Sequence, residues 1–175
     1  MICNNSKILN IRPIERDDLK LIQKWRNFKS IQPLVREYRE MSMDHIIEWY
    51  DNTILNNKFE FFIIEDKKNK PIAITGFTYI DWVNKNADLH LAIYEYEWGD
   101  LKIGSEIMQI MLAYGFKFLN LHRIYAEIYE IDIKKLKLFE SFNFKTDAVL
   151  RDHFYHDGSY KNSHILSLLK SEYGR

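Results

Sequence analysis

The sequence predicts a mixed α/β (α+β) fold in which helices cover both faces of a twisted, mostly antiparallel sheet of about seven strands. Apolar residues at helical spacing fill two segments near the start, and three short runs of β-branched and aromatic residues follow. Helical and strand patterns then alternate to the end. With three prolines, six glycines and no linker-like segment, residues 1–175 are expected to form one domain.

The first elements are a short strand and two helices. Residues 7–14 read as a strand that ends near Pro13, and Asp17 or Asp18 is the expected N-cap of the first helix. Ser42 is the expected N-cap of the second helix. The apolar stripe of the first helix consists of Leu19, Ile22, Trp25 and Phe28.

The middle of the chain predicts an antiparallel meander, because three strand patterns follow one another with only turn residues between them. These strands are residues 59–64, 71–80 and 87–94. A mostly apolar helix is then expected at residues 103–119, followed by a strand at 123–129. Asp132 and Asn143 should cap the two ends of a short helix. Two last strands, residues 144–150 and 160–169, should be joined by a turn at 157–159.

Composition excludes several classes of protein. The 25 basic and 25 acidic residues cancel, whereas a duplex-nucleic-acid binder would carry a basic excess. No run approaches the ~20 apolar residues that span a bilayer, so no membrane role is expected. A lone cysteine, Cys3, cannot form an internal disulfide. We therefore expect a cytoplasmic protein, as a monomer or a homodimer.

Several segments in a fixed order resemble the GNAT acetyltransferases, and within them the branch typified by the ribosomal-protein-alanine acetyltransferases. The resemblance runs nearly end to end. It depends on residues 12–19 (RPIERDDL), 24–27 (KWRN), 119–125 (LNLHRIY), 150–153 (LRDH) and 156–160 (HDGSY).

This resemblance implies an acetyl-CoA site where the fourth and fifth strands splay apart. The pantetheine would pair with the fourth strand near Leu91 and Ile93. The pyrophosphate would bind at the N-terminus of the following helix, where backbone N–H groups carry partial positive charge. The remaining coenzyme-binding residues that the resemblance implies are Lys102, Ile103, Gly104, Ser105, Asp132 and Phe139.

The chain departs from the family's pattern in its phosphate loop and in its short helix. In the phosphate loop, usually Arg-Gly-x-Gly-x-Gly, the arginine position is Gly99 and the first two glycine positions are Asp100 and Lys102, so only Gly104 remains. The tyrosine that often protonates the departing thiolate is replaced by Phe139. An alternative is therefore a GNAT-fold domain that binds acyl-CoA or a protein partner without turnover.

The expected reaction is direct attack of a primary amine on acetyl-CoA in a ternary complex. The acceptor could be a protein N-terminus, a polyamine or a nucleotide-linked amino sugar. Asp88 and His90 share one face of their strand and are candidate bases. Tyr129, or Tyr125, could replace the missing acid. The alternative for Asp88 and His90 is that they are ordinary exposed polar residues of the strand.

Three residues are candidates for binding the acceptor: Arg26, Asn27 and Trp82. Trp25 suits core packing at least as well as the site. An acidic group formed by Glu95, Glu97 and Asp100 would favour a cationic acceptor, unless it is only a solvated loop. The motif His153-x-x-His156-Asp157 has some features of a metal site, but its expected hairpin position favours surface residues, so no metal is expected.

Overall fold

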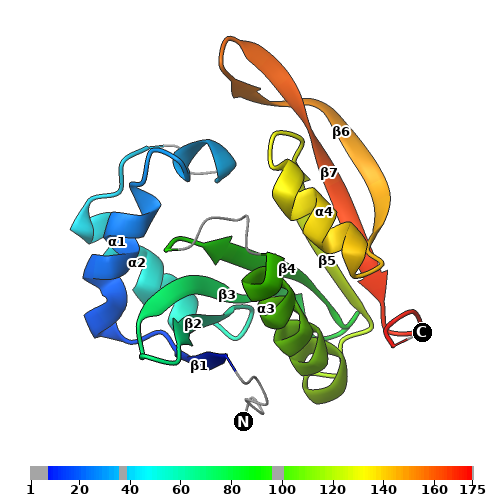
Figure 1. The fold of residues 1–175 in the computed structure, drawn as a ribbon, viewed down its shortest axis with the longest axis horizontal. Coiled ribbons are helices and arrows are strands. Elements are labelled where there is room, and N and C mark those ends of the chain that lie inside the picture. The colour runs from blue at the N-terminus through cyan, green and yellow to red at the C-terminus, as the bar shows by residue number, and fades with distance from the viewer. Residues whose placement is uncertain (1–7, 36–38, 96–100, 175) are drawn as a thin grey trace.

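The computed structural model describes residues 8–35, 39–95 and 101–174, in which seven strands form one sheet in the order β1-β2-β3-β4-β5-β7-β6 (Figure 1). This confirms the predicted fold class. The strands are β1 (Leu9–Pro13), β2 (Glu60–Asp66), β3 (Pro71–Asp81), β4 (Asn86–Ile93), β5 (Arg123–Tyr129), β6 (Lys145–His156) and β7 (Ser159–Leu169). The helices are α1 (Leu19–Arg26), α2 (Met43–Ile54), α3 (Leu101–Ala113) and α4 (Ile133–Ser141), with short helical turns η1 (Arg16–Asp18), η2 (Gln32–Leu34) and η3 (Tyr114–Phe118).

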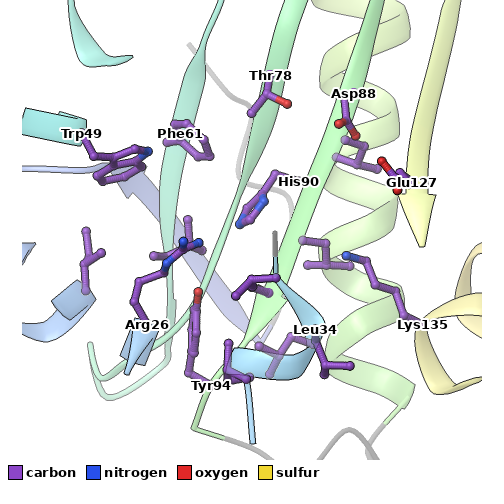
Figure 2. Close-up of a pocket in the computed structure, with 18 of the residues that line it drawn as sticks. Arg26, Leu34, Trp49, Phe61, Thr78, Asp88, His90, Tyr94, Glu127 and Lys135 are labelled. Atoms are coloured by element: carbon purple, nitrogen blue, oxygen red, sulfur yellow. The ribbon is translucent and has the colours of Figure 1, made fainter. Parts of the chain in front are cut away.

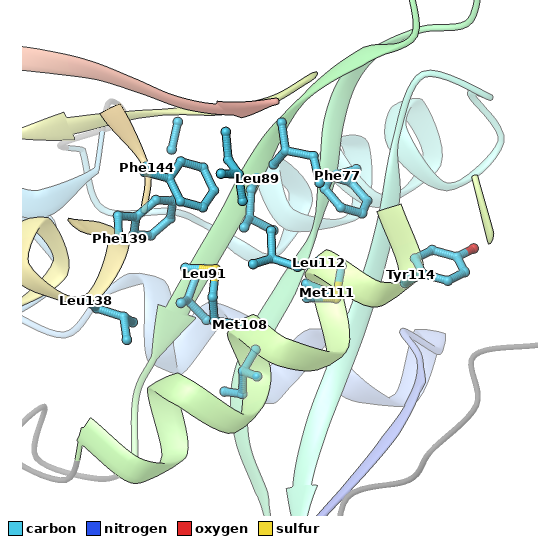
Figure 3. Packing of buried hydrophobic residues seen from close by; sticks show 14 of the residues in the cluster. Phe77, Leu89, Leu91, Met108, Met111, Leu112, Tyr114, Leu138, Phe139 and Phe144 are labelled. Atoms are coloured by element: carbon cyan, nitrogen blue, oxygen red, sulfur yellow. The ribbon is translucent and has the colours of Figure 1, made fainter. Parts of the chain in front are cut away.

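Two hydrophobic cores lie on opposite faces of the sheet. On one face, α1 and α2 pack on β2 and β3 through Trp25, Ile46 and Ile63. On the other face, α3 and α4 cover the centre of the sheet. Figure 3 shows Met108 of α3 and Phe139 of α4 in one hydrophobic cluster with Leu89 and Leu91 of β4. Residues 61–64 are buried throughout because β2 is covered on both faces, which explains their uninterrupted apolar run.

The predicted caps of α2 and α4 are confirmed. The Ser42 hydroxyl accepts the backbone N–H of His45 at 3.2 Å, and the Asp132 carboxylate accepts that of Lys135 at 3.1 Å. Asn143 has a φ of 63°, which suits the end of α4. Asp18 is the N-cap residue of α1 as predicted, but its side chain makes no capping hydrogen bond to that helix. Its carboxylate instead accepts the Glu15 N–H at 2.8 Å within a capping box of the turn η1.

The hairpin of β6 and β7 is longer than predicted. The sequence predicts a strand at residues 144–150, whereas β6 continues to His156 and extends well beyond α4 (Figure 1). Most of β6 is exposed, so burial imposes no apolar alternation and its second half carries no strand pattern. The turn is confirmed: Asp157 and Gly158, at φ 46° and 80°, join the two strands as in a type I′ hairpin.

The sheet opens between β4 and β5. Of the strand pairings within the described residues, this one alone is parallel, and its register covers three residue pairs: Asn86 with Arg123, Ala87 with Ile124 and Asp88 with Tyr125. Both strands then continue, β4 to Ile93 and β5 to Tyr129, without further paired residues. The splayed fourth and fifth strands that the resemblance implies are therefore present.

Candidate active site

A cavity of about 430 Å³ lies on the α1–α2 face of the sheet and reaches the opening between β4 and β5. Figure 2 shows Arg26 and Trp49 on the side formed by α1 and α2, and Asp88, Glu127 and Lys135 on the side formed by β4, β5 and α4. Ile31, Leu34 and Val35, in and beside η2, also line it. The cavity therefore combines an aromatic and aliphatic lining with a group of charged side chains, the composition typical of a small-molecule site.

The aromatic side of the cavity is fixed by stacking. Trp25, which is fully buried in α1, stacks on Tyr94 with ring centroids 4.6 Å apart. The Trp25 indole also donates to the Glu95 carboxylate at 2.9 Å, and Lys70 contacts the same carboxylate at 3.0 Å. Glu95 thus holds α1 against the end of β4. Its proposed partners in an acidic group, Glu97 and Asp100, lie outside the described residues.

Strand alternation brings the polar residues of the cavity to one face. Ala87, Leu89, Leu91 and Ile93 are buried in the core, so Asp88 and His90 face the other way. Asp88 pairs with Tyr125, which directs Glu127 and Tyr129 of β5 to the same face as Asp88. Asp88, His90, Glu127 and Tyr129 all line the cavity.

Burial determines the charge of the groups in the cavity. It lowers the pKa of the His90 imidazole to about 3, and the cations Lys135 and Arg26 act in the same direction. The ring is therefore neutral near pH 7. Burial also raises the pKa of the Tyr94 hydroxyl to about 12 and lowers that of the Lys135 ammonium, although Asp132 and Asp88 oppose the second change.

Several of the predicted site residues lie together. Besides Asp88, His90 and Tyr129, the cavity is lined by Arg26, Leu91, Ile93 and Asp132. Two predicted acceptor-binding residues are not in its lining. Asn27 instead clamps the backbone of Met41, accepting its N–H at 2.8 Å and donating to its carbonyl at 3.0 Å. Trp82 lies at the β3–β4 turn, where its indole donates to the Asn57 carbonyl at 2.8 Å.

The residues predicted to bind the coenzyme lie on the α3–α4 side of the opening. Lys102 is exposed in the first turn of α3, Ile103 is buried and Ser105 is half-buried. Gly104 faces α4 so closely that an added Cβ would lie 3.0 Å from Leu138, so this glycine permits close packing of the two helices. Gly99 and Asp100 lie outside the described residues.

Phe139 lies in the core rather than at the surface of the site. Its side chain is fully buried, and its ring contacts Phe144 edge-on with centroids 4.8 Å apart (Figure 3). A phenyl ring has no proton to donate, so another group must serve any acid step. Tyr129, which lines the cavity and stacks on Phe154 at 4.0 Å, is one such group.

The opening fits a pantetheine chain. Beyond Asp88, the backbone of β4 is no longer paired with β5. Its edge on this side can therefore hydrogen-bond the amides of an extended ligand. The predicted Leu91 and Ile93 lie in this part of β4. Among the described residues there is no cluster of three or more His, Cys, Asp or Glu side chains suited to a metal ion.

Sequence reasoning missed two charged residues of the cavity. Glu127 is a polar position in an alternating strand, and Lys135 is the third residue of a short helix. Each has the local pattern of an ordinary exposed residue. The parallel register of β4 and β5, which a sequence does not show, is what brings them to Asp88.

Comparisons with known proteins agree with this geometry. The family described as the acetyltransferase (GNAT) domain matches residues 9–145. A spermidine N(1)-acetyltransferase of Vibrio cholerae is 27% identical, over 94% of this chain and 95% of the relative. An uncharacterized N-acetyltransferase, p20 of Bacillus licheniformis, is 29% identical over 94% of each chain.

Solved structures extend the comparison. The crystal structure of the Vibrio cholerae spermidine N-acetyltransferase with CoA and spermine is 26% identical to this chain. It superposes with a TM-score of 0.88, over 95% of this chain and 98% of the other. These relatives carry names other than that of the ribosomal-protein branch, so the narrower resemblance stays a prediction. In the described part of the chain, no helix has the length and apolar character needed to cross a bilayer.

Proposed function

Because the chain belongs to the GNAT acetyltransferase family, we propose that its cavity binds a small polyamine, whose primary amine receives the acetyl group of acetyl-CoA. One observation carries the choice of acceptor: the carboxylates of Asp88, Glu127 and Asp132 line the cavity where the sheet opens. A nitrogen cation entering there would meet carboxylates in a partly dry site, where attraction is stronger than in water. The spermidine acetyltransferases among the relatives support the same acceptor.

The acceptor must be desolvated and deprotonated by residues of this chain. An alkylamine has a pKa near ~10.4 and arrives as an ammonium. Asp88 would orient this ammonium, while the aromatic side of the cavity contacts the aliphatic chain of the polyamine. His90 remains neutral near pH 7 because its pKa is about 3, so it suits a hydrogen-bonding role better than that of a base.

Acetyl-CoA, when bound, supplies an acetyl thioester at the opening of the sheet. The backbone of Leu91 and Ile93 would hold its pantetheine, and Lys102 would pair with its phosphates. One C–N bond forms as one C–S bond breaks, and the sum is ammonium plus thioester giving amide, thiol and one proton. Tyr129 would donate the proton that the sulfur takes, because Phe139 has none to give, and would regain a proton from the acylated nitrogen.

Calorimetry and an amine screen test this function. Acetyl-CoA should bind with micromolar affinity, and Lys102→Glu should weaken binding about 10-fold through loss of a phosphate contact. Lys117→Glu, a charge reversal at the other end of the same helical segment, is the matched control and should change little. Spermidine and spermine should release thiol, and Asp88→Asn should raise KM for both.

Other results would change the conclusion. Release of thiol with peptides that bear a free N-terminus, and none with polyamines, would replace the proposed acceptor. If acetyl-CoA binds and no amine is acetylated, the chain is instead a binding domain without turnover.

A further inference from the structure

A buried carboxylate in the cavity contacts a histidine that reaches solvent. The Glu127 side chain is 9% exposed, whereas that of His153 on β6 is 43% exposed. Nδ1 of His153 lies 2.9 Å from Oε1 of Glu127. The pair therefore joins the interior of the cavity to bulk water through two side chains that can each carry a proton.

The contact between Glu127 and His153 spans the strand β7. The sheet order is β5-β7-β6, so β7 lies between Glu127 and His153. Ser163 of β7 is fully buried between them, and its Oγ lies 2.7 Å from Nδ1 of His153. A serine is small enough to let the imidazole reach past it, and its hydroxyl is a third polar group for the same nitrogen.

An irregularity in β6 directs His153 to this position. Leu150 pairs with Ser163 and Phe154 with Lys161, so residues 151–153 lie opposite the single residue Asn162. Asp152 within this bulge has a φ of 50°. Bulges redirect side chains and recur beside active sites. Phe154 then stacks on Tyr129 at 4.0 Å, which fixes the bulged strand against β5.

The proposed reaction needs such a route. Each turnover of an ammonium with an acetyl thioester releases one proton, and a proton left on the carboxylate that accepts it would stop the next cycle. His90 cannot carry it, because burial holds its pKa at about 3. Glu127 lies on the same face as Asp88, within the cavity.

We infer that Glu127 and His153 are a proton exit from the acceptor site. The amine proton moves to the Glu127 carboxylate and from there to Nδ1 of His153, and the imidazolium, on a side chain that is 43% exposed, releases its Nε2 proton to water. Glu127 returns to carboxylate, and His153 is left as the neutral Nδ1–H tautomer. Exchange of the ring protons with water restores the Nε2–H tautomer before the next cycle. This inference rests on the proposed amine acetylation and adds the route by which the proton leaves.

Other charged and titratable groups line the same cavity as Glu127. Asp88 and His90 come from β4, Asp132 and Lys135 from the start of α4, and Arg26 from α1. A pH profile of the wild-type enzyme alone would therefore mix several groups. The test must compare variants that remove one partner at a time.

The first experiment measures kcat/KM for spermidine between pH 5 and 9. Glu127→Gln should lower it about 100-fold, in the range of general-base catalysis. His153→Gln should lower kcat about 10-fold, change the pH profile of the rate and be rescued by added imidazole. The matched control His156→Gln, on the same strand beside the turn, should keep the wild-type profile.

A structural role of His153 would give a different result: a loss of rate with an unchanged pH profile and no rescue by imidazole. That outcome would overturn the inference. Thermal melting of each variant separates these losses from unfolding.

The second experiment does not depend on turnover. The nitrogen-15 NMR shift of His153 Nδ1 at one fixed pH should differ between the wild type and Glu127→Gln, because the substitution changes the group that lies 2.9 Å from this nitrogen. Identical spectra would refute the pair while amine acetylation still stands. Different spectra in a protein that acetylates no amine would instead refute the proposed function.

Discussion

The two halves of the sheet differ in how they are covered. Strands β1–β4 form a half that is packed on both faces, by α1 and α2 on one side and by α3 on the other. Strands β5–β7 form a half whose outer strand, β6, is exposed along most of its length. The halves pair through three residue pairs at the start of β4 and β5.

This difference shows why the cavity lies where it does. The packed half supplies Asp88 and His90 on a strand with little freedom to move, and the open half supplies Glu127 and Tyr129. An acceptor site needs one side that fixes geometry and another that admits substrate and releases protons. The junction of the halves offers both.

The largest expected difference in stability is between two aromatic residues, one in each half of the sheet. Trp25→Ala removes a fully buried ring from the packed half and should lower the free energy of unfolding by about 3–5 kcal/mol. Tyr155→Ala removes a ring that is 65% exposed on the hairpin and should cost less than about 1 kcal/mol. Urea denaturation of both variants measures this. Equal losses would mean that the hairpin is packed in solution.

Two glycines, one in each half of the sheet, allow the same comparison of stability for changes at the backbone. An added Cβ at Gly76 would lie 1.9 Å from the Glu60 carbonyl oxygen, so Gly76→Ala must separate β2 from β3 and should cost about 3 kcal/mol. Gly158 at the hairpin turn has φ 80° and open space, so Gly158→Ala should cost about 1 kcal/mol, from backbone strain alone. Thermal denaturation gives both values, and a reversed order would contradict the comparison.

The smallest effect concerns the junction itself. His90 has a pKa of about 3 when folded and 6.5 when unfolded, so between these values the unfolded state binds more protons. Stability is therefore lost as the pH falls below about 6.5. From pH 7 to 5 the wild type should lose about 2 kcal/mol more than His90→Gln. Urea denaturation at the two pH values tests this. If the wild type and His90→Gln lost the same free energy of unfolding, His90 would be exposed to solvent.

Local chemistry made much of the fold predictable. The caps at Ser42, Asp132 and Asn143 each depend on residues within one turn, and all three are present. The hydrogen bonds of the Asp18 side chain were harder to predict. Arg12 on β1 donates to its carboxylate at 2.7 and 2.8 Å, and this contact depends on how the strand and the helix pack. The second half of β6 was not predicted because it is mostly exposed, so its sequence does not need alternating apolar residues.

The site was less predictable than the fold. Alternation on β4 singles out Asp88 and His90, and both line the cavity, although their roles stay predictions. Asn27 looked like a substrate contact and is instead a backbone clamp for Met41. His153 reaches Glu127 only through sheet order and a bulge. No pattern within a single segment carries that information.

The three-pair junction also bears on how the molecule acquires its structure. The β2–β4 meander and the β6–β7 hairpin join neighbours in the chain, so their ends meet at little entropic cost. Pairing Asn86 with Arg123 closes a loop that contains all of α3, and only two more residue pairs follow. We therefore expect the meander and the hairpin to form early in folding and the junction to close late. Mutations that weaken the junction should then speed unfolding more than they slow folding.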